Sequence, residues 1–523
     1  MQPSEPISEE ASVKVLLLSE LEFENLANLA PPLVVCFGQF DVIHPGHIRY
    51  LQFAKAQGAT LIVALEGDQV GANDSLSSRY SASLRAQSLT ALGDVDCVVI
   101  LDSGGLELLV EQVRPDKLVL GKEYESPSLD QERKDKVLPA VGLIAKGNAE
   151  TIYAAGETHY ATDMLFRATT TELERDRWSG FRRALDDQEI NLKTVLNKFK
   201  ETRLTRLLVV GDSIIDRYIA CDPIGMSNEA PIVVVRELDE KEFVGGAGIV
   251  AAHVSSLGAE CEFVSVVGED GRSKILEEEL QAFDVNHSLI PDATRPTTLK
   301  TRFLVENQKM FRVSRLRDHE LSEKIERELI DKIYSIVPTL SGIIVSDFVY
   351  GVITPNVVNV LREVSQDYGI TLCGDLQCSS QIGDVSKFSG FDFLSPTEKE
   401  ARIALNNHND GVEQIANLLI GKTSVRNLIV KLGAEGFIAY QVSDDNETIA
   451  RQHFPALSVN PLDVTGAGDS LLATIAVGLT RGLNLMEASA LGACVSSLAV
   501  ETVGNRPVSL DRLEHFIFSY GVD

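Results

Sequence analysis

The feature that most constrains the fold is an alternation of short apolar runs with segments of helical periodicity. In the first third of the chain the apolar runs, each typical of a buried strand, lie at 32–36, 60–65, 96–101 and 117–120. The helix-like segments lie between them, near 45–57, 82–92 and 105–114. Alternation of this kind predicts a parallel sheet with helices on its faces.

The alternation is interrupted once and then resumes. Residues 157–203 contain many charges, no proline and few strand signals, which predicts helical structure. Residues 470–520 also have mostly helical character. Between these segments, further strands are predicted at 206–211, 231–235, 262–267, 342–346, 371–375 and 427–431.

This organisation predicts two doubly wound α/β domains rather than one. At 523 residues the chain is too long for a single hydrophobic core. The predicted boundaries follow from where the alternation stops. They give a first α/β domain at 1–165, a helical connector at 166–203 and a second α/β domain at 204–523.

Composition and charge exclude several classes of function. The formal net charge is −28, from 48 Lys and Arg against 76 Asp and Glu, so the chain lacks the basic footprint that nucleic-acid binding needs. No apolar run approaches the roughly 18 residues of a membrane helix, and the polar, acidic N-terminus is unlike a signal peptide. The seven cysteines form no CxxC pair, which indicates buried thiols in a reducing compartment. We therefore expect a cytoplasmic protein whose partners are small molecules, phosphorylated ones included.

The segment CFGQFDVIHPGH has the first candidate site. Its apolar run ends at Gly38, and helical periodicity begins near Pro45, a residue suited to the first turn of a helix. His44 and His47 therefore lie at a helix N-terminus, where free backbone amides and the helix dipole attract anions. Two imidazoles there could donate hydrogen bonds to phosphate oxygens as charge builds during a displacement.

Two other interpretations of this histidine pair are open at this point. Zinc sites with two helical histidines usually use an i, i+4 spacing and a third ligand. Here the spacing is three, and no cysteine or carboxylate cluster lies nearby to complete the ligand set. The two histidines could also do no more than cap the helix.

The wider segment resembles the signature of the cytidylyltransferase-like nucleotidyltransferases. That resemblance implies a Rossmann-like domain in which the histidines stabilise the α- and β-phosphates of a nucleoside triphosphate. A sugar phosphate or alcohol phosphate attacks, and pyrophosphate leaves with the assistance of Mg²⁺. The resemblance extends to Asp68, at the end of the second strand, and to Arg85 on the following helix. The residues that carry it are Gly38, Phe40, Asp41, His44, Gly46 and His47.

Two positions of this domain depart from the family pattern. The family has a lysine a few residues before its equivalent of Tyr124, but here Leu120 takes that place and Lys122 is displaced by two. Near the domain end the family has a Ser-Thr-Thr run that touches the triphosphate, but here the sequence is YATD, with only Thr162 in register. We therefore expect an altered nucleotide pocket, or a slow or silent domain.

The most specific segment of the chain is NPLDVTGAGDS, at 460–470. Its glycines follow a strand-like run and precede a long apolar helix, so they expose backbone amides that can cradle a phosphoryl group. Asp469 beside them could accept the proton of an attacking hydroxyl, and phosphoryl transfer needs little besides positioning, charge stabilisation and such a base. Taken alone, the segment could also be a tight strand-to-helix turn with an acidic cap.

Together with three other segments, this one resembles the ribokinase-like sugar kinases over roughly 204–517. The others are VVGDSIIDRYI, FVGGAGIVAAHVSSLGA and VKLGAEG, in the family's order. The resemblance implies that Asp469 is the catalytic base and that ATP is the phosphoryl donor. It places the sugar pocket at Asp216, Gly245 and Gly246. It places the anion hole and the ATP site at Thr465, Gly466, Ala467, Gly468, Lys431, Gly433 and Gly436.

Within that family the chain resembles the bacterial heptose 7-phosphate kinases. Residues 227–235 match their Ser-x-Glu-Ala-Pro segment, which includes Glu229, and residues 297–312 match a run with several basic residues. Such residues would suit a substrate that already has a phosphate, although a charged face on a solvated strand is the alternative. The basic residues are Lys300, Arg302 and Arg312.

The sugar pocket and the metal site depart from the kinase pattern. The family asparagine that contacts sugar hydroxyls is Ile249 here, which cannot make such a hydrogen bond, so we expect a different substrate preference. The Asn-x-x-Glu segment associated with Mg²⁺ keeps only its glutamate, Glu400, as the expected metal ligand. Two lysines of the family are replaced by Tyr350 and Gln377.

The pairing of the two resemblances predicts the function. Phosphorylating a sugar phosphate and attaching a nucleotide to a sugar 1-phosphate are consecutive chemistry. The chain resembles the bifunctional heptose 7-phosphate kinase/heptose 1-phosphate adenylyltransferases, whose kinase domain comes first, with the order reversed. It is predicted to make an ADP- or CDP-heptose-like nucleotide sugar for lipopolysaccharide or another surface polysaccharide. The kinase would use ATP and Mg²⁺, and the transferase would use ATP or CTP.

Three points stay open. The chain could be a sugar kinase whose first domain is a degenerate regulatory module, or a non-catalytic sugar-nucleotide sensor or scaffold. The sequence does not choose the sugar, the phosphorylated carbon or the transferred nucleotide. The resemblance also implies a homodimer through the kinase domain, in which strands near 218–235 and 300–315 form a lid or an interface.

Overall fold

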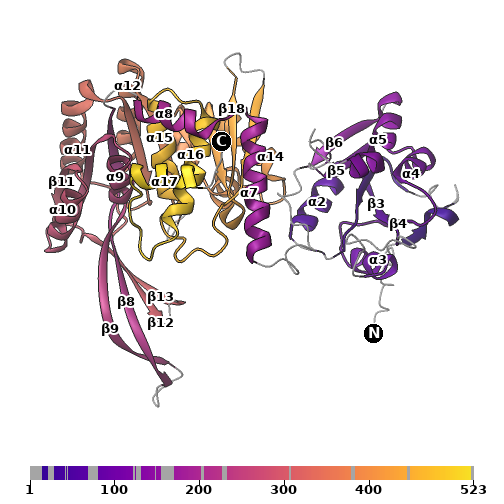
Figure 1. Ribbon diagram of the computed structural model, residues 1–523, viewed down its shortest axis with the longest axis horizontal. Coiled ribbons are helices and arrows are strands. Elements are labelled where there is room, and N and C mark those ends of the chain that lie inside the picture. The colour runs from indigo at the N-terminus through magenta and orange to yellow at the C-terminus, as the bar shows by residue number, and fades with distance from the viewer. Residues whose placement is uncertain are drawn as a thin grey trace, which may run out of the picture. The chain divides into compact units, whose positions relative to one another are not determined.

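Contacts divide the chain into two compact units, both α/β structures built on largely parallel sheets, which confirms the predicted fold class (Figure 1). The smaller unit comprises residues 1–167 with 407–415, and the larger unit comprises 168–406 with 416–523. The structure is a computed structural model. It describes residues 14–21, 29–41, 43, 45–68, 80–121, 124, 131–147, 149–154, 170–201, 205–226, 232–305, 308–378, 383–443 and 448–519.

The sheet of the smaller unit has six parallel strands in the order β1-β4-β3-β2-β5-β6. Its strands are rich in Val, Leu and Ile because both faces of the sheet are covered. The chain runs outward from β2 to β3 and β4 and then crosses to β5, so the order reverses at β2, where open α/β sheets bind ligands. The bounds are β1 (Lys14–Leu17), β2 (Leu33–Gly38), β3 (Thr60–Glu66), β4 (Cys97–Leu101), β5 (Lys117–Gly121) and β6 (Glu150–Ala154).

Helices cover both faces of this sheet. One apolar cluster includes Leu51 and Leu89, from the first two helices, and a separate cluster includes Leu109 and Ile144, from the next two. Two clusters on opposite sides of one parallel sheet are typical of a doubly wound fold. The helices are α2 (Pro45–Lys55), α3 (Ala82–Thr90), α4 (Leu106–Val113) and α5 (Gln131–Lys146).

The main sheet of the larger unit has nine strands in the order β11-β10-β7-β14-β15-β16-β17-β18-β19. Its strands are parallel from β11 to β17, and β18 and β19 are antiparallel at one edge. All five predicted strands of this sheet are present. The bounds are β7 (Arg206–Gly211), β10 (Glu260–Gly268), β11 (Asn286–Asp292), β14 (Gly342–Asp347), β15 (Thr371–Leu376), β16 (Phe393–Leu394), β17 (Asn427–Lys431), β18 (Phe437–Val442) and β19 (Ile449–Phe454).

A second sheet of four strands, in the order β13-β12-β8-β9, projects from the larger unit (Figure 1). We call it the lid sheet. The bounds are β8 (Ser213–Met226), β9 (Val233–Gly246), β12 (Thr298–Val305) and β13 (Gln308–Arg315). Together with Ile232, which directly precedes β9, it exposes eight large apolar side chains, and the other seven are Ile224, Met226, Val233, Leu238, Met310, Phe311 and Val313.

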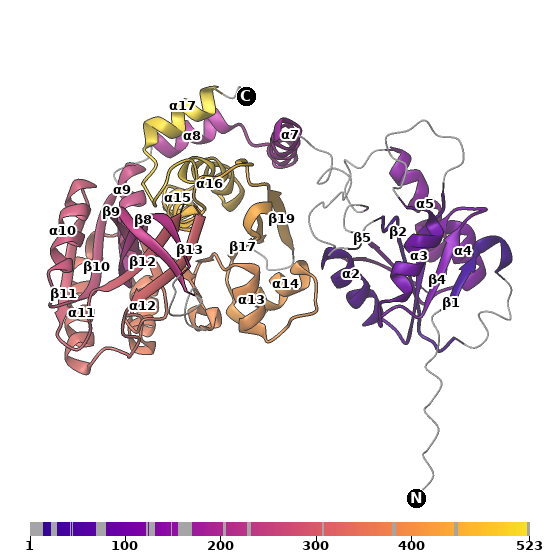
Figure 2. The ribbon, with the colours of Figure 1, turned by 90° about the horizontal axis from the view of Figure 1, so that it is seen from below.

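Seven helices share one apolar core cluster with the main sheet of the larger unit. They are α7 (Thr170–Asp187), α8 (Leu192–Glu201), α9 (Ala247–Ser256), α10 (Arg272–Ala282), α15 (Ala467–Thr480), α16 (Leu485–Ala499) and α17 (Leu510–Ser519). Figure 2 shows α8 and α17 side by side, and contacts between them agree with that view. The other described helices of the larger part of the chain are α11 (Glu323–Ile336), α12 (Pro355–Tyr368), α13 (Glu398–Leu405) and α14 (Val412–Thr423).

The described part of the predicted connector consists of α7 and α8, and both pack into the core of the larger unit. Phe181, Leu196 and Phe199 are fully buried in that core. The rest of each helix is polar, so the two helices bury one stripe and expose the other. The segment therefore belongs structurally to the larger unit.

Within the described residues, no helix is both long enough and apolar enough to cross a membrane. The seven cysteines are free thiols, and all but the half-buried Cys378 are buried, as the sequence predicted.

Candidate active sites

The smaller unit has a candidate nucleotide site where β2 ends. A Cβ atom at Gly38, the last residue of β2, would lie 2.8 Å from the ring of Phe40, so the close turn requires glycine. Phe40 has a positive φ of 48°, an uncommon conformation for a bulky residue, and its side chain is buried. Its ring centroid lies 4.9 Å from that of His47, in the first turn of α2 with Gly46. The turn therefore fixes one imidazole at a helix N-terminus, at the point where the strand order reverses.

Arg85 stabilises this turn through its guanidinium group. Its side chain has no exposed surface, and it donates to three backbone carbonyls, at 2.5, 2.8 and 3.1 Å, and to Asp68 Oδ1 at 3.2 Å. The three carbonyls belong to Gln39, Glu66 and Tyr80. Asp68 keeps 54% of its side chain exposed, and Asp41 Oδ1 accepts from the Tyr80 amide at 3.3 Å. Arg85 thus positions the turn, and the carboxylates of Asp68 and Asp41 lie beside it.

The structure gives other predicted positions of this site no polar role, or does not describe them. Leu120, at the position where the resemblance implied a lysine, is fully buried in β5 and is part of the core. Tyr124 packs on Phe37, with ring centroids 6.0 Å apart. Three residues predicted from the sequence, His44, Thr162 and Glu229, lie outside the described residues, as does Lys122.

In the larger unit, the candidate site centres on the loop that enters α15. Gly466 has a φ of 92°, and a Cβ atom there would overlap the side chain of Asn505, so only glycine fits. Ala467, Gly468 and Asp469 form the first turn of α15, whose backbone amides have no helical partner. The predicted anion hole corresponds to these amides, and Asp469 belongs to the same turn.

Asp469 is held by two amide side chains. Gln377 Nε2 donates to Oδ1 at 2.6 Å, and Asn505 Nδ2 donates to Oδ2 at 3.1 Å. Burial, followed by the negative charge of Asp375, raises the pKa of Asp469 to about 6, while Gln377 and Lys431 act in the opposite direction. A carboxylate with that pKa is ionised at neutral pH and is a stronger base than an ordinary aspartate.

A buried histidine lies behind Asn505. His253 Nε2 is 3.4 Å from Asn505 Oδ1, and burial lowers the pKa of His253 to about 4, so its ring is neutral. With Nε2 protonated, the imidazole would donate to Asn505 Oδ1 and leave the amide nitrogen to face Asp469. Sequence reasoning missed both residues, because they lie 252 positions apart and neither is in a recognisable motif.

The predicted sugar pocket lies at the base of the lid sheet. Asp216 on β8 pairs with Arg302 on β12, and a Cβ atom at Gly245 would overlap Asp216 Oδ2. Lys300 is buried, with its ammonium 4.6 Å from the ring centroid of Phe348. Of the remaining predicted residues, Gly246 precedes α9 with a φ of 59°, and Arg312 is exposed on β13.

The lid sheet reaches the anion-hole loop through Lys309. The ammonium of Lys309, on β13, donates to Asp463 Oδ1 at 2.6 Å and to Thr465 Oγ1 at 2.9 Å. Tyr218 on β8 donates to Asp463 Oδ2 at 2.9 Å. Two strands of the lid sheet therefore contact the loop that precedes Gly466.

The predicted ATP-site turn follows β17. Lys431, the last residue of β17, donates to Asp375 Oδ1 at 2.8 Å. Gly433 and Gly436 have φ values of 65° and 93°, which the tight turn between β17 and β18 requires. Lys431 and the turn thus lie on one connection, and the lysine reaches Asp375 on β15, which β16 separates from β17 in the sheet.

Glu400, the predicted Mg²⁺ ligand, lies in the first turn of α13. Its two carboxylate oxygens accept from the backbone amides of Cys378 and Thr397, each at 2.8 Å. Asp375 Oδ2 is buried without a hydrogen-bond partner among the described residues. Mg²⁺ prefers oxygen ligands and is commonly held by one or two carboxylates together with nucleotide phosphates, so this donor set fits the ion. Within the described residues, no group of three or more His, Cys, Asp or Glu side chains is placed to hold a metal by itself.

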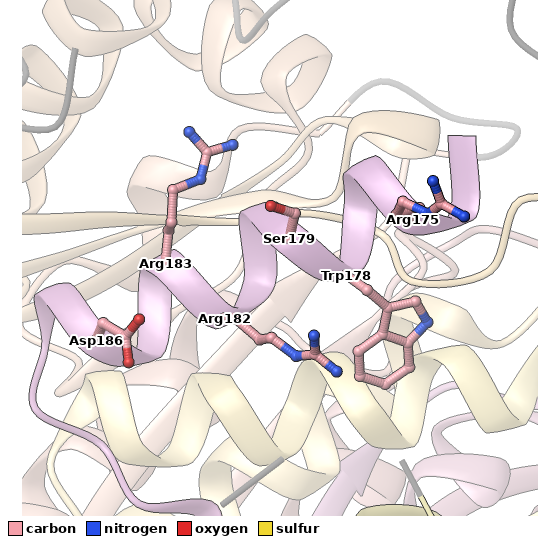
Figure 3. Close-up of a pocket in the computed structure, with 6 residues that line it drawn as sticks. All are labelled: Arg175, Trp178, Ser179, Arg182, Arg183 and Asp186. Carbon is pink, nitrogen blue, oxygen red and sulfur yellow. The ribbon is translucent and has the colours of Figure 1, made fainter. Parts of the chain in front are cut away.

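A surface hollow of about 590 Å³ lies on α7 (Figure 3). In the figure, Trp178 and Arg182 point to one side of the helix, while Ser179 and Arg183 point to the other. The polar groups therefore do not converge on a common point, as they do in ligand sites. We assign no function to this hollow. Its lining residues are Arg175, Trp178, Ser179, Arg182, Arg183 and Asp186.

Two protein-family sequence models match the chain. The model described as pfkB family carbohydrate kinase matches residues 204–511, which is more than half of the chain. The model described as cytidylyltransferase-like matches residues 35–175. The two predicted resemblances therefore occur in the predicted order.

Curated relatives align with about three fifths of the chain. Bifunctional protein HldE of Pelobacter propionicus is 30% identical over 324 residues, which are 61% of this chain and 64% of that protein. The protein of the same name from Campylobacter jejuni is 31% identical over 323 residues, which are 61% of this chain and 66% of that protein. The chain thus spans less than two thirds of the length of either relative.

Solved structures show the fold of the larger part. Escherichia coli phosphofructokinase-2, determined in complex with substrates and products, is 17% identical, with a TM-score of 0.50. The similarity covers 61% of this chain and 99% of that chain. At this level of identity, the similarity concerns the fold alone.

Proposed function

The chain belongs to the PfkB family of carbohydrate kinases, and from that membership we propose that its larger unit transfers the terminal phosphoryl group of ATP to a hydroxyl group of a sugar phosphate. One observation carries this proposal. Asp469, a buried carboxylate with a pKa of about 6, lies in the first turn of α15 beside the backbone amides that follow Gly466. A base and an anion-binding loop in contact are what phosphoryl transfer to a hydroxyl needs.

The roles of the residues follow from the direction of charge movement. The acceptor hydroxyl oxygen forms a bond to the γ-phosphorus, and the bond between that phosphorus and the β–γ bridging oxygen breaks, so ADP leaves with the electron pair. The hydroxyl proton moves to the Asp469 carboxylate, which Gln377 and Asn505 hold in orientation. The amides of Gly466, Ala467 and Gly468 donate to the phosphoryl oxygens during transfer.

Mg²⁺ fits this site as a second source of positive charge. Glu400 and Asp375 would hold it together with the nucleotide phosphates, and it would neutralise phosphate charge there. Lys431, Gly433 and Gly436 lie on the connection that we assign to ATP binding.

We assign the sugar phosphate to the base of the lid sheet. Asp216 is near enough to Asp469 for its negative charge to raise the pKa of that base, so the two carboxylates border one site. Lys300 and Arg302 supply positive charge there for a phosphate that the substrate already has. Ile249 is fully buried and offers no hydrogen bond, which supports a substrate whose hydroxyl contacts differ from those of the family's standard one.

We propose nucleotidyl transfer as the activity of residues 1–165. The cytidylyltransferase-like match, the fixed imidazole of His47 and the position of the site at the reversal of strand order support it. In this reaction a sugar 1-phosphate oxygen attacks the α-phosphorus of ATP or CTP, and the bond from that phosphorus to the α–β bridging oxygen breaks. Pyrophosphate leaves. The two units would then make an ADP- or CDP-heptose-like nucleotide sugar, as the bifunctional relatives suggest.

One observation favours a second candidate, a kinase whose smaller unit is regulatory. Leu120 is buried at the position where related proteins have a lysine, so that position supplies no charge for the triphosphate. A smaller unit that binds a nucleotide without turnover would satisfy this observation. The product analysis below separates the two candidates.

We also propose that the protein forms a dimer through the lid sheet. Eight large apolar side chains of that sheet are exposed, which is unfavourable in water and is typical of an association surface. A second copy of the lid sheet would cover them. Sedimentation velocity of the wild type and of Leu238→Lys tests this, because the variant should shift the protein toward monomer.

Phosphorus NMR of the purified protein is the test of both activities. With Mg²⁺, ATP, CTP and a panel of hexose and heptose phosphates, ADP and a sugar bisphosphate should appear and should vanish in Asp469→Asn. Sugar 1-phosphates should give pyrophosphate and a sugar–nucleotide diphosphate, and His47→Ala should remove them. If pyrophosphate never appears, the regulatory candidate replaces bifunctionality. If neither product set appears, the protein is a sensor or scaffold.

A further inference from the structure

A lysine of the larger unit lies among three carboxylates at the proposed site of phosphoryl transfer. Only 12% of the side chain of Lys431 is exposed, and its ammonium donates to Asp375 Oδ1 at 2.8 Å. Burial disfavours the ammonium, but Asp375, Glu400 and Asp469 together raise the pKa of Lys431 above its ordinary value. The side chain is therefore positively charged at neutral pH.

The ammonium of Lys431 also lies beside the predicted anion hole. A Cβ atom built on Gly468 would lie 3.5 Å from Nζ of Lys431, and the lysine supplies the atoms nearest to that position. Gly468 directly precedes Asp469, the proposed base. The charge is thus next to both the amides and the base, although it comes from a different element, β17.

We propose that Lys431 is a catalytic residue that contacts the γ-phosphoryl group of ATP during its transfer. This inference rests on the kinase function proposed above for the larger unit. Three carboxylates would repel a triphosphate unless positive charge offsets them, because the repulsion between charges a few ångströms apart is strong where water is excluded. Lys431 offsets one of the three negative charges at the position where the phosphoryl group would enter.

Asp375 is the residue that holds the lysine in place. Its Oδ1 accepts from Lys431 and also from Ser395 Oγ, both at 2.8 Å, in a side chain with no exposed surface. The ammonium has three donors, and Asp375 takes one of them. A rigid carboxylate on one side leaves the remaining donors available for phosphoryl oxygens on the other.

A purely structural ion pair is the alternative role for Lys431. In that case the lysine would only neutralise Asp375, and its removal would affect all nucleotides alike. A contact with the γ-phosphoryl group predicts a selective effect, since ATP has that group and ADP does not.

The test is calorimetric titration of the full chain, with Mg²⁺, by ADP and by AMP-PNP, an analogue of ATP that is not hydrolysed. His47→Ala serves as the background, so that the second proposed nucleotide site does not contribute. Adding Lys431→Met should weaken AMP-PNP binding by roughly tenfold or more and ADP binding by less than about threefold. The kcat of the kinase reaction should fall by roughly 10²- to 10³-fold.

A matched control is Lys198→Met. Lys198 on α8 also pairs with a carboxylate, Glu487, at 3.0 Å, but lies outside the proposed site, so both affinities should stay unchanged. Equal weakening of both nucleotides by Lys431→Met, or weakening of neither, would overturn the proposal. The titration needs no turnover, so it still decides the role of Lys431 if the wild type binds nucleotides but phosphorylates no sugar.

A second variant guards against misfolding. Lys431→Met leaves Asp375 as an unpaired buried charge, which can destabilise a protein strongly. The double variant Lys431→Met/Asp375→Asn removes both charges, and thermal unfolding should show that it folds. Because Asp375 is also a proposed Mg²⁺ ligand, the reference for this variant is Asp375→Asn alone. Relative to that reference, the double variant should show the same selective loss of AMP-PNP binding, and an unchanged ratio of AMP-PNP to ADP affinity contradicts the proposal.

Discussion

The two candidate sites differ in how far along the chain their side chains are separated. In the smaller unit, the glycine turn, the Phe40 ring and the His47 imidazole all lie within residues 38–47. In the larger unit, Asp469 is held by Gln377 and Asn505, which are 92 and 36 residues away. The first site is therefore a local strand–turn–helix motif with one distant support, Arg85, and the second is assembled by the whole fold. This contrast predicts that a substitution at the first site affects only the altered residue's own contacts, while a substitution at the second also changes the contacts of several neighbouring side chains.

Asp469→Asn should have the largest effect. An amide cannot accept the hydroxyl proton, so the kcat of the kinase reaction should fall by about 10³-fold or more. Pyrophosphate release with a sugar 1-phosphate should be unchanged, because the candidate site in the smaller unit shares no described residue with the site around Asp469. ADP and pyrophosphate assays on the same preparation check both expectations. Loss of both reactions together would break the comparison between independent sites.

His47→Ala should have the opposite pattern and a somewhat smaller effect. Removing a donor to the triphosphate should lower pyrophosphate release by roughly 10²-fold, with the kinase reaction unchanged. His515→Ala, which removes an exposed imidazole on α17, is the control and should change neither reaction. A fall in ADP formation with His47→Ala would mean that the two reactions are coupled.

Gln377→Leu should change the pH dependence of the kinase reaction. In the wild type, the rate should fall below a pH of about 6, because protonated Asp469 cannot act as a base. The Gln377 hydrogen bond stabilises the carboxylate, so its removal raises the pKa of Asp469 and moves this acidic limb to higher pH. We expect a roughly two- to fivefold loss of rate at pH 6 and a smaller loss at pH 8. An acidic limb that stays in place, or moves to lower pH, contradicts the assignment of the base.

Lys309→Met should have the smallest effect. Lys309 joins the lid sheet to Asp463, but 40% of its side chain is exposed, so water screens part of the interaction. The KM for the sugar phosphate should rise by roughly threefold with little change in kcat, because the lid would close less firmly. High salt should raise the KM of the wild type in the same direction. Lys274→Met, at an exposed position on α10, should leave the KM unchanged.

The sequence predicted most strands of the main sheets and the position of the loop that enters α15, for physical reasons. Buried parallel strands read as continuous apolar runs, so β7 and β17 begin and end at the predicted residues. The GAGD segment indicates a loop from the sequence alone, because Gly466 can adopt the left-handed conformation that this loop requires.

Other features could not be predicted in the same way. The strands β8 and β9 have 14 residues each, and charged residues interrupt their apolar runs, so only the start of β9 was predicted, by the strand at 231–235. The contacts of Asn505 and His253 with the base exist only in the folded chain, since nothing local distinguishes these residues. The helices α7 and α8 were predicted as a connector, yet the stripe of Phe181, Leu196 and Phe199 is the signal of a buried face.

Trp178, the only tryptophan of the chain, is an intrinsic fluorescent probe of the larger unit. Its ring lies 5.7 Å from Phe516 and 5.9 Å from Phe181, both in the larger unit. Indole fluorescence, excited selectively, therefore reports the unfolding of the larger unit, and the smaller unit contributes no signal because it has no tryptophan. Circular dichroism reports both units at once, so a denaturation curve recorded by the two methods separates the stabilities of the two halves without any added label.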